Sequence, residues 1–488
     1  MTARKENSKY YVKIIIWLAV IIILWQIPAG GALTPAGVHT LAVFVGLIWG
    51  LITIGNEIPG LVCTVLMAFT GAFSSIAESL MAGFGSQTVV MVFSLLLISG
   101  VMSASGLAQT IARRMINAKF AAGKPWRLTL VIMITSAVIS AFIHPLVIIL
   151  VIANICLNIF KELDLEKGNR WAMLTLMDIT VVAINANDIL PFQPANGFTF
   201  GFFTSFDSRL SVSAVAGPHI IASILLEVLL IAFCFVLTRV SCKKCVEKLY
   251  AYKPKEVNEP FTPKMKATLT IFIVYIFANL LPLALPDGSF KDFMNTFGIP
   301  GWAIAAVIVC IFIRRKDGTH LMTFDEIQQS GVKWGLLLML LGICACVAPM
   351  TSDVTGISTW LGDLIRPVAL NLGEFGCFVM LTMFCLLLTN FADNIAVNFI
   401  IVPIAFIVCK ETGLNPYLTI SWVIHGFQFG ILTPAATPHI AFIFGMTDTG
   451  YVSKGRLMLW AIPKIIFVGI VIVFIGWLTK GLYPAFVW

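Results

Sequence analysis

Long apolar runs separated by short polar or basic segments make up most of this chain. Most of the runs are long enough to cross roughly 30 Å of hydrocarbon as a helix, and the period-2 alternation of a transmembrane barrel is absent. The pattern therefore predicts an all-α polytopic membrane protein with about eleven transmembrane helices. The spans are expected near residues 13–28, 38–54, 59–73, 88–102, 171–190, 218–237, 267–285, 302–313, 334–347, 417–432 and 457–478.

Two further apolar segments, 128–160 and 378–409, are predicted to return to the side from which they enter. Basic loops flank the first segment on both sides, and charged residues flank the second segment in the same way. We expect each to form a re-entrant helical hairpin, with polar residues and helix breakers near its middle, where they face a cavity. These residues are Ser140, His144 and Pro145 in the first hairpin and Asn390, Asp393 and Asn394 in the second.

The same pattern occurs twice along the chain. Gly106-Leu107-Ala108 begins one copy and Gly356-Ile357-Ser358 the other, and a Pro-x-x-x-Phe-x-Phe-Gly stretch closes the copies at Pro194 and at Pro438. The spacing between the two starts places His144 opposite Asn394. Because the copies begin on opposite sides of the membrane, they form inverted-topology repeats, which is how secondary transporters build a site at the bilayer midplane.

An interrupted helix follows each hairpin, at residues 171–205 and 417–446. Closely spaced prolines with Asn, Gly or Thr unwind an apolar helix. Free amides at the start of the resumed half-helix suit carboxylates, while freed carbonyls and Asn or Asp oxygens suit a small cation. The predicted organisation is scaffold helices at 10–73 and 218–313, transport parts at 86–205 and 333–446, and a C-terminal helix at 457–488.

Composition agrees with a membrane protein, with 59% hydrophobic residues, 11% charged residues and a mean hydropathy of +0.95. Most of the 32 Lys and Arg fall in loops that share one side if the N-terminus is cytoplasmic. The positive-inside rule then predicts a multi-pass inner (plasma) membrane protein, whose first apolar run is an uncleaved helix. The eleven cysteines, mostly in apolar runs, are expected to be reduced packing residues, and Cys242-x-x-Cys245 lacks a partner pair for zinc.

Catalytic motifs such as HExxH or a Ser-His relay are absent, which disfavours an enzyme, and no catalytic residue is predicted. A channel is disfavoured because the symmetry is internal and inverted.

At these residues the chain resembles the divalent anion:sodium symporter family, a part of the wider ion transporter superfamily. The likeness covers nearly the whole chain and includes Leu33-Thr34-Pro35-Ala36-Gly37, Val332-Lys333-Trp334-Gly335 and Ala436-Thr437-Pro438. It implies a homodimer that carries a di- or tricarboxylate with Na⁺ by an elevator motion. Where the family has Ser-Asn-Thr at both hairpin tips, this chain has Ile143-His144-Pro145 and Asp393-Asn394-Ile395, and Gln193-Pro194 replaces the first Thr-Pro.

These considerations give two sets of candidate residues. The substrate set is His144, Pro145, Gln193, Asn196, Asn394, Thr437 and Pro438, and the coupling-ion set is Asn187, Asp188, Asp393, Asn394 and Ala436. The expected partners are a small anion and the lipid bilayer, without nucleic acid, and no cofactor or metal is expected beyond Na⁺. The alternative is an H⁺-coupled carrier or an exchanger for a different anion that uses Asp393 or His144, since an intramembrane Asp can hold a proton and His titrates near neutrality.

Ionised Asp188 and Asp393 would repel a nearby anion, so a cation or proton is expected to bind first.

Overall fold

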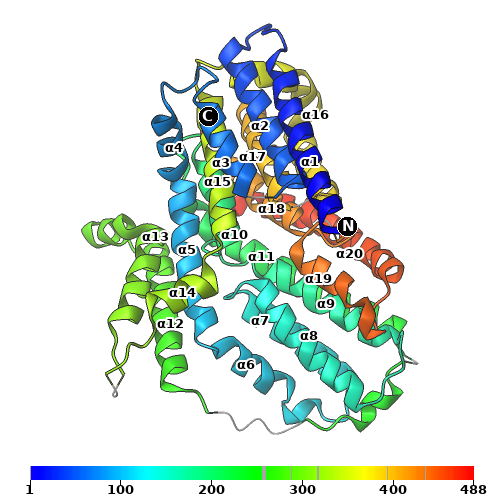
Figure 1. The fold of residues 1–488 in the computed structure, drawn as a ribbon. Coiled ribbons are helices and arrows are strands. Elements are labelled where there is room, and N and C mark those ends of the chain that lie inside the picture. Colours follow the sequence, from blue (N-terminus) through cyan, green and yellow to red (C-terminus); the bar gives the residue numbers. More distant parts are fainter. Residues whose placement is uncertain are drawn as a thin grey trace.

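The computed structural model describes the chain except residues 1, 56, 244, 255–259, 287, 316–317, 393 and 435. Within the described residues the regular structure is helical, apart from one isolated bridge between Arg314 and His320 (Figure 1), which confirms the predicted all-α class. The α-helices are α1 (Thr2–Trp25), α2 (Pro35–Thr53), α3 (Glu57–Met67), α4 (Ile76–Phe84), α5 (Gln87–Ala104), α6 (Leu107–Ile116), α7 (Pro125–Ser140), α8 (Pro145–Glu162), α9 (Arg170–Ala186), α10 (Pro194–Thr204), α11 (Val212–Ser241), α12 (Pro263–Ala284), α13 (Ser289–Phe312), α14 (Phe324–Gly331), α15 (Trp334–Val347), α16 (Ile357–Thr389), α17 (Asn394–Thr412), α18 (Pro416–Gln428), α19 (Pro438–Gly445) and α20 (Lys454–Leu478).

Seven helices in the described part of the chain are long and apolar enough to cross a membrane singly: α5, α8, α11, α12, α13, α16 and α20. α14 and α15 meet the same criterion as a pair that is bent by 68°. Shorter apolar helices occur within α1, α2, α3 and α7. Several candidate spans are therefore present, while the number of eleven stays a prediction.

The helices follow the same order in the two predicted copies. α6 and α16 each begin after a glycine in the left-handed conformation, Gly106 (φ 72°) and Gly356 (φ 66°). Next come two packed helices, which are α7 and α8 in the first copy and, in the second copy, α17 and the part of α16 that follows its kink at Gly373 (φ 64°). Each pair is followed by a helix that breaks and resumes at a proline, α9 to α10 and α18 to α19. The helix boundaries thus fall where the repeat pattern places them, and the opposite orientation of the copies stays a prediction.

Two close helix crossings join the first half of the chain to the second. α3 packs against α15, and α14 packs against α5. A Cβ added to Gly342 of α15 would lie 2.6 Å from the carbonyl oxygen of Gly60 in α3, and one added to Gly331 of α14 would lie 2.5 Å from the nitrogen of Gly100 in α5. Facing glycines let two helix backbones approach closely, so the same device is used at both crossings.

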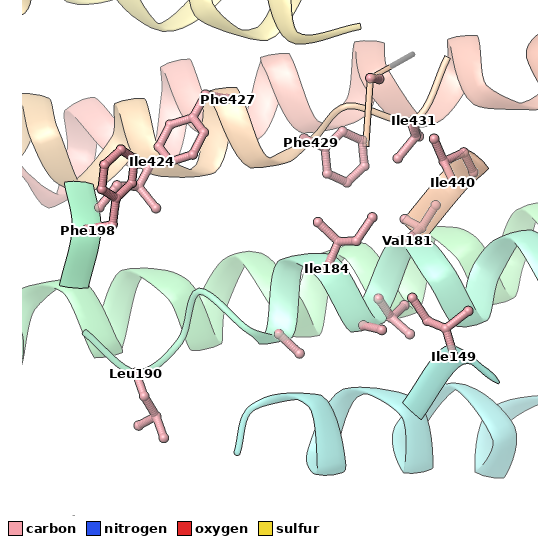
Figure 2. Packing of buried hydrophobic residues seen from close by; sticks show 14 of the residues in the cluster. Ile149, Val181, Ile184, Leu190, Phe198, Ile424, Phe427, Phe429, Ile431 and Ile440 are labelled. Atoms are coloured by element: carbon pink, nitrogen blue, oxygen red, sulfur yellow. The ribbon is translucent and has the colours of Figure 1, made fainter. Parts of the chain in front are cut away.

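The two interrupted helices form the centre of the protein. Every residue of α9 after Arg170 is buried, and so is every residue of α18. Figure 2 shows apolar side chains of α8, α9, α18 and α19 packed around the breaks, among them Ile149, Ile184, Phe427 and Ile440. These helices therefore hold the unwound segments in a fixed, largely apolar setting.

α11 packs against α7, α9, α18 and α20, whereas α12 and α13 pack against each other and against α5. The predicted scaffold segment 218–313 includes helices of both groups, and the division into scaffold and transport parts stays a prediction. All eleven cysteines are free, and all but Cys245 are buried.

Candidate functional site

A cavity of about 400 Å³ lies where the two hairpin turns meet the two helix breaks. Its lining combines segments that are far apart in the sequence, including parts of α5, α8, α9, α10, α15, α17, α18 and α19. The polar and charged side chains in this lining are Glu57, His144, Asn187, Lys333, Asn394, Gln428 and His439. The volume lies in the range of pockets that hold small molecules.

Four helices begin at the wall of this cavity. The lining includes Pro145 at the start of α8, Pro194 at the start of α10, Asn394 at the start of α17 and Pro438 at the start of α19. Proline is favoured at the first helical position because its missing N–H has no partner in the helix there. Helix N-termini carry a partial positive charge and free amides, so this convergence favours an anion.

Lys333 and His144 meet at the wall of the cavity, and the two groups that face each other there both donate hydrogen bonds. The backbone N–H of Leu146 donates to Nδ1 of His144 (3.3 Å), so this nitrogen carries no hydrogen, and a neutral ring carries its hydrogen on Nε2. Nε2 lies 3.3 Å from Nζ of Lys333. An ammonium group and a ring N–H are both donors, so they cannot hydrogen-bond to each other. An acceptor within reach of both groups would give each donor a partner.

A second imidazole joins this pair. The ring of His439 stacks on His144 with centroids 5.4 Å apart, and His439 is in electrostatic range of Lys333. Neither ring nitrogen of His439 has a hydrogen-bond partner among the described residues. Glu57 is the one acidic residue in the described lining. Basic groups therefore outnumber acidic groups at this site.

The second hairpin turn is tied to the second break by two asparagines. Asn394 donates from Nδ2 to Oε1 of Gln428 (2.7 Å) and from its backbone N–H to the carbonyl of Ala436 (3.2 Å). Oδ1 of Asn390 accepts from the backbone N–H groups of Ile431 and Leu432, at 3.0 and 2.9 Å. Asn390 thereby takes the place of the helical partners that the unwound segment has lost.

At the first break, amide side chains bind the hairpin turn and the unwound chain. Nδ2 of Asn187 donates to the carbonyl of Ser140 (3.1 Å), and Nε2 of Gln193 donates to that of Ala141 (2.6 Å). Nδ2 of Asn196 donates to the carbonyls of Asp188 and Leu190, at 2.8 and 3.0 Å. Of these three amides, Asn187 alone is part of the cavity lining.

The predicted candidates thus fall into three groups. His144, Pro145, Asn187, Asn394 and Pro438 line the cavity.

Five others lie outside the lining. Gln193, Asn196 and Ala436 brace the breaks through the bonds above, and Asp188 faces His425 of α18. Thr437 caps α19, where its Oγ1 accepts from the N–H of Ile440 (3.3 Å). Asp393 lies outside the described residues.

Four polar or charged residues of the lining are absent from the sequence-based sets: Glu57, Lys333, Gln428 and His439. Two of them adjoin residues that the sequence does single out, since Lys333 stands in the Val332–Gly335 motif and His439 follows Pro438. Glu57 and Gln428 lie in none of the motifs that the sequence analysis identifies, so the sequence offers no comparable signal for them.

A chain of many apolar helices, with a central cavity between two helical hairpins and two interrupted helices, has the architecture of a polytopic secondary transporter. Comparison with known proteins agrees with this class. The chain belongs to the citrate transporter family, whose model (CitMHS, citrate transporter) matches residues 43–424. This confirms the resemblance to the ion transporter superfamily, and the protein is a multi-pass membrane transporter.

Individual relatives are distant in sequence. An uncharacterized transporter of Haemophilus influenzae is 21% identical over 432 residues, which cover 86% of each chain. The sodium-dependent dicarboxylate transporter SdcS of Staphylococcus saprophyticus is 22% identical over 190 residues, 38% of this chain and 35% of SdcS. The crystal structure of the YdaH transporter of Alcanivorax borkumensis has a similar fold, with a TM-score of 0.61, 14% identity and coverage of 84% and 89% of the two chains.

Proposed function

We propose that this protein carries a di- or tricarboxylate across the membrane and binds it in the central cavity. The observation that supports this most directly is the pair of facing donors, Nζ of Lys333 and Nε2 of His144, 3.3 Å apart. One carboxylate that accepts from both groups removes their mutual repulsion. Because four helix N-termini and His439 adjoin the same cavity, a second carboxylate also finds partial positive charge there.

The coupling ion in this proposal is Na⁺, held by oxygens at the second hairpin turn and the first break. Asn187 and Asn394 face the cavity, and the carbonyl of Ala436 lies beside Asn394. Side-chain amide and backbone carbonyl oxygens are suitable ligands for a hard cation. Sequence similarity to a sodium-dependent dicarboxylate transporter supports this assignment. The alternative remains an H⁺-coupled carrier or an exchanger for a different anion, with Asp393 or His144 as the titrating group.

The wider setting of the proposal is a homodimer in the inner (plasma) membrane, with its N-terminus in the cytoplasm. Transport is by an elevator motion of the parts that include both hairpins and both breaks. This rests on the family resemblance and on the distribution of basic loops. The cation or proton binds before the anion, because it offsets the carboxylates near the cavity.

Uptake of labelled citrate, malate and succinate into proteoliposomes tests the function. It is measured with an imposed Na⁺ gradient, an H⁺ gradient or neither. We expect uptake of at least one carboxylate, driven by Na⁺. Uptake driven by H⁺ alone would overturn the sodium assignment, and uptake of none of the three carboxylates would overturn the proposed cargo.

The substitution Lys333→Met tests the site. Loss of a charge-assisted hydrogen bond costs about 1.5–3 kcal/mol, which raises the KM for the carboxylate about 10- to 150-fold. Lys333→Arg retains a cation and is expected to retain most of the affinity. The matched control is Lys266→Met on the exposed start of α12, which should leave uptake unchanged. Equal KM values for the Lys333→Met and Lys266→Met variants would refute the cavity as the binding site.

A further inference from the structure

The C-x-x-C motif directly after α11 places two thiols, those of Cys242 and Cys245, in one tight turn. The backbone N–H of Cys245 donates to the carbonyl of Cys242 at 2.9 Å. A turn of this kind keeps its first and fourth Cα atoms within about 7 Å, and disulfides usually join Cα atoms about 4.4–6.8 Å apart. The turn therefore brings the two cysteines into the range of a disulfide.

The two thiols differ in their exposure. Cys242 is 0% exposed, whereas Cys245 is the one of the eleven cysteines that is not buried. Burial, together with the neighbouring Cys245, raises the pKa of Cys242 to about 12, so this thiol is a poor nucleophile at neutral pH. An accessible thiol beside a second thiol that can resolve its product is an arrangement often found in redox sensors.

The accessible thiol of Cys245 lies in a pocket of about 330 Å³, here named the basic pocket. The charged residues of its lining are Lys167, Arg170, Lys248, Arg456, Glu166 and Glu247. Asp164 pairs with Lys248 at 3.5 Å, and with this carboxylate included the group still has one positive charge in excess. A cleft with an excess of positive charge attracts anions, so the thiol lies where an anionic reagent is favoured.

The same turn holds the start of α9. The carbonyl of Cys245 accepts from Nδ2 of Asn169 at 3.1 Å, and Oδ1 of Asn169 accepts from the N–H of Ala172 at 3.1 Å, which caps α9. Nη1 of Arg170 donates to the carbonyl of Ser241 at 3.1 Å. α9 runs from these contacts to the first break at the wall of the central cavity. A covalent change in the turn therefore acts on a helix that forms part of that wall.

We infer that Cys242 and Cys245 form a reversible thiol–disulfide site, whose reagent is a small disulfide with carboxylate groups, such as glutathione disulfide. The pair lies in one of the basic loops that the positive-inside rule assigns to the cytoplasm. Protein disulfides in the cytosol are usually transient and serve catalysis or redox sensing. The bridge acts on transport through the start of α9.

The reaction is thiol–disulfide exchange in two steps. The thiolate of Cys245 attacks one sulfur of the small disulfide, whose S–S bond breaks, and one half leaves as a thiolate that takes up the proton released by Cys245. Sγ of Cys242 then attacks Sγ of Cys245, and the second half leaves with the proton of Cys242. The two thiols of the protein are oxidised to one disulfide, and the reagent is reduced to two free thiols.

The first test is mass spectrometry of the native protein after incubation with glutathione disulfide. We expect the unchanged protein to end with a bridge between Cys242 and Cys245 and no lasting adduct, because the second step releases the reagent. Cys242→Ser should stop at a stable glutathione adduct on Cys245, and Cys245→Ser should form neither product. The matched control is Cys310→Ala, which removes a buried thiol of α13 and should react like the unchanged protein.

Three results of this test would overturn the inference. They are a Cys245→Ser variant that reacts as fast as the Cys310→Ala control, an unchanged protein that keeps the adduct without forming the bridge, and an unchanged protein that does not react. The masses do not depend on the cargo, so a failure of the proposed transport function leaves this test decisive.

The second test concerns the basic pocket and uses the Cys242→Ser variant, in which the first step occurs alone. Its rate is measured with glutathione disulfide, which is anionic, and with cystamine, which has two ammonium groups. Each rate is divided by that of the same disulfide with free cysteine. We expect the ratio to favour glutathione disulfide about 10-fold at low salt.

Adding Arg456→Gln should reduce this preference, because Arg456 lines the basic pocket. Adding Lys266→Met, at an exposed position outside the pocket, should leave it unchanged. Equal normalised rates for the two reagents would refute the pocket as the site that selects the disulfide.

The third test asks whether the bridge acts on transport, and this part rests on the proposed function. Uptake of labelled carboxylates into proteoliposomes is measured for the reduced protein, the oxidised protein and the oxidised protein after treatment with dithiothreitol. We expect oxidation to lower the rate of uptake, dithiothreitol to restore it, and Cys245→Ser to be insensitive to both. Equal, measurable uptake in the reduced and oxidised states would refute the link to transport, whereas no uptake in either state would count against the proposed cargo.

Discussion

The ion pair between Lys464 of α20 and Asp178 of α9 offers a sharp test of what holds the interrupted helix in place. Both side chains are fully buried, and Asp178 also accepts from the hydroxyl of Thr238 in α11 at 2.7 Å. Through the ion pair and the hydrogen bond from Thr238, Asp178 links α9 to both α20 and α11. Lys464→Met removes the cation and leaves a buried carboxylate that keeps only the neutral donors of α11, the hydroxyl of Thr238 and the thiol of Cys234.

Breaking a buried pair by removing one partner costs about 3–5 kcal/mol, because the other charge stays desolvated. Replacing both partners by uncharged groups of similar size avoids most of this cost. We therefore expect Lys464→Met to lower the unfolding temperature by several degrees. The double variant Asp178→Asn with Lys464→Met should recover most of the loss, which gives a coupling free energy of about 2–3 kcal/mol in a double-mutant cycle.

The assay uses the cysteines of the protein itself. Ten of the eleven are buried, so a maleimide dye that fluoresces on reaction with thiols reports their exposure during thermal unfolding in detergent. Lys266→Met on the exposed start of α12 is the matched control and should melt like the unchanged protein. An unfolding temperature for Lys464→Met equal to this control, or a double variant as unstable as the single one, would refute the reasoning.

Two further predictions concern the second break and the outer surface. Asn390→Ala leaves the N–H groups of Ile431 and Leu432 without their acceptor. The free energy of unfolding should therefore fall by about 1–3 kcal/mol, and uptake should fall with it. An unchanged unfolding temperature of this variant would contradict the role of Asn390 in holding the second break. The hydrogen bond and charge of Arg209 lower the pKa of Asp207, which lies in the connection before α11. The stability that Asp207 contributes is therefore present above its unfolded pKa of about 3.9 and is lost as pH falls through the lower folded pKa. The unfolding temperature of Asp207→Asn should depend less on pH in this acid range, and an unaltered pH dependence would refute the assignment.

The sequence predicts the local features of this fold well, because they depend on patterns within short segments. The turn at His144, the restart of α10 at Pro194 and that of α19 at Pro438 follow from breakers inside apolar runs. Such breakers act on the backbone directly, whatever the tertiary structure. The two matching left-handed glycines, Gly106 and Gly356, are also visible as a repeated motif.

The sequence is less informative about which polar side chains reach the cavity. Gln193 and Asn196 are natural candidates because their side chains are polar. In the structure, however, their side-chain amides donate to backbone carbonyls of the hairpin turn and the unwound chain. Conversely, Lys333 approaches His144 from 189 positions away in the chain. Pairings of this kind depend on the tertiary arrangement that brings the residue before α15 to the first hairpin turn, and no local pattern encodes that arrangement.

The break after α9 places two neighbouring residues in different electrostatic settings, and this bears on how coupling works. Asn187 lines a cavity with an excess of basic groups, while the carboxyl of Asp188 lies outside the cavity lining, 3.8 Å from Nδ1 of His425 and within electrostatic range of Glu227. In the proposed function, an anion in the cavity and a Na⁺ held by oxygens of the first break have opposite charges and lie close together, so each favours the other. Binding of one is then expected to tighten binding of the other by the same factor, since coupling between two sites is reciprocal. Carboxylate affinity should therefore rise with Na⁺ concentration, and a carboxylate affinity that is equal with and without Na⁺ would refute this coupling.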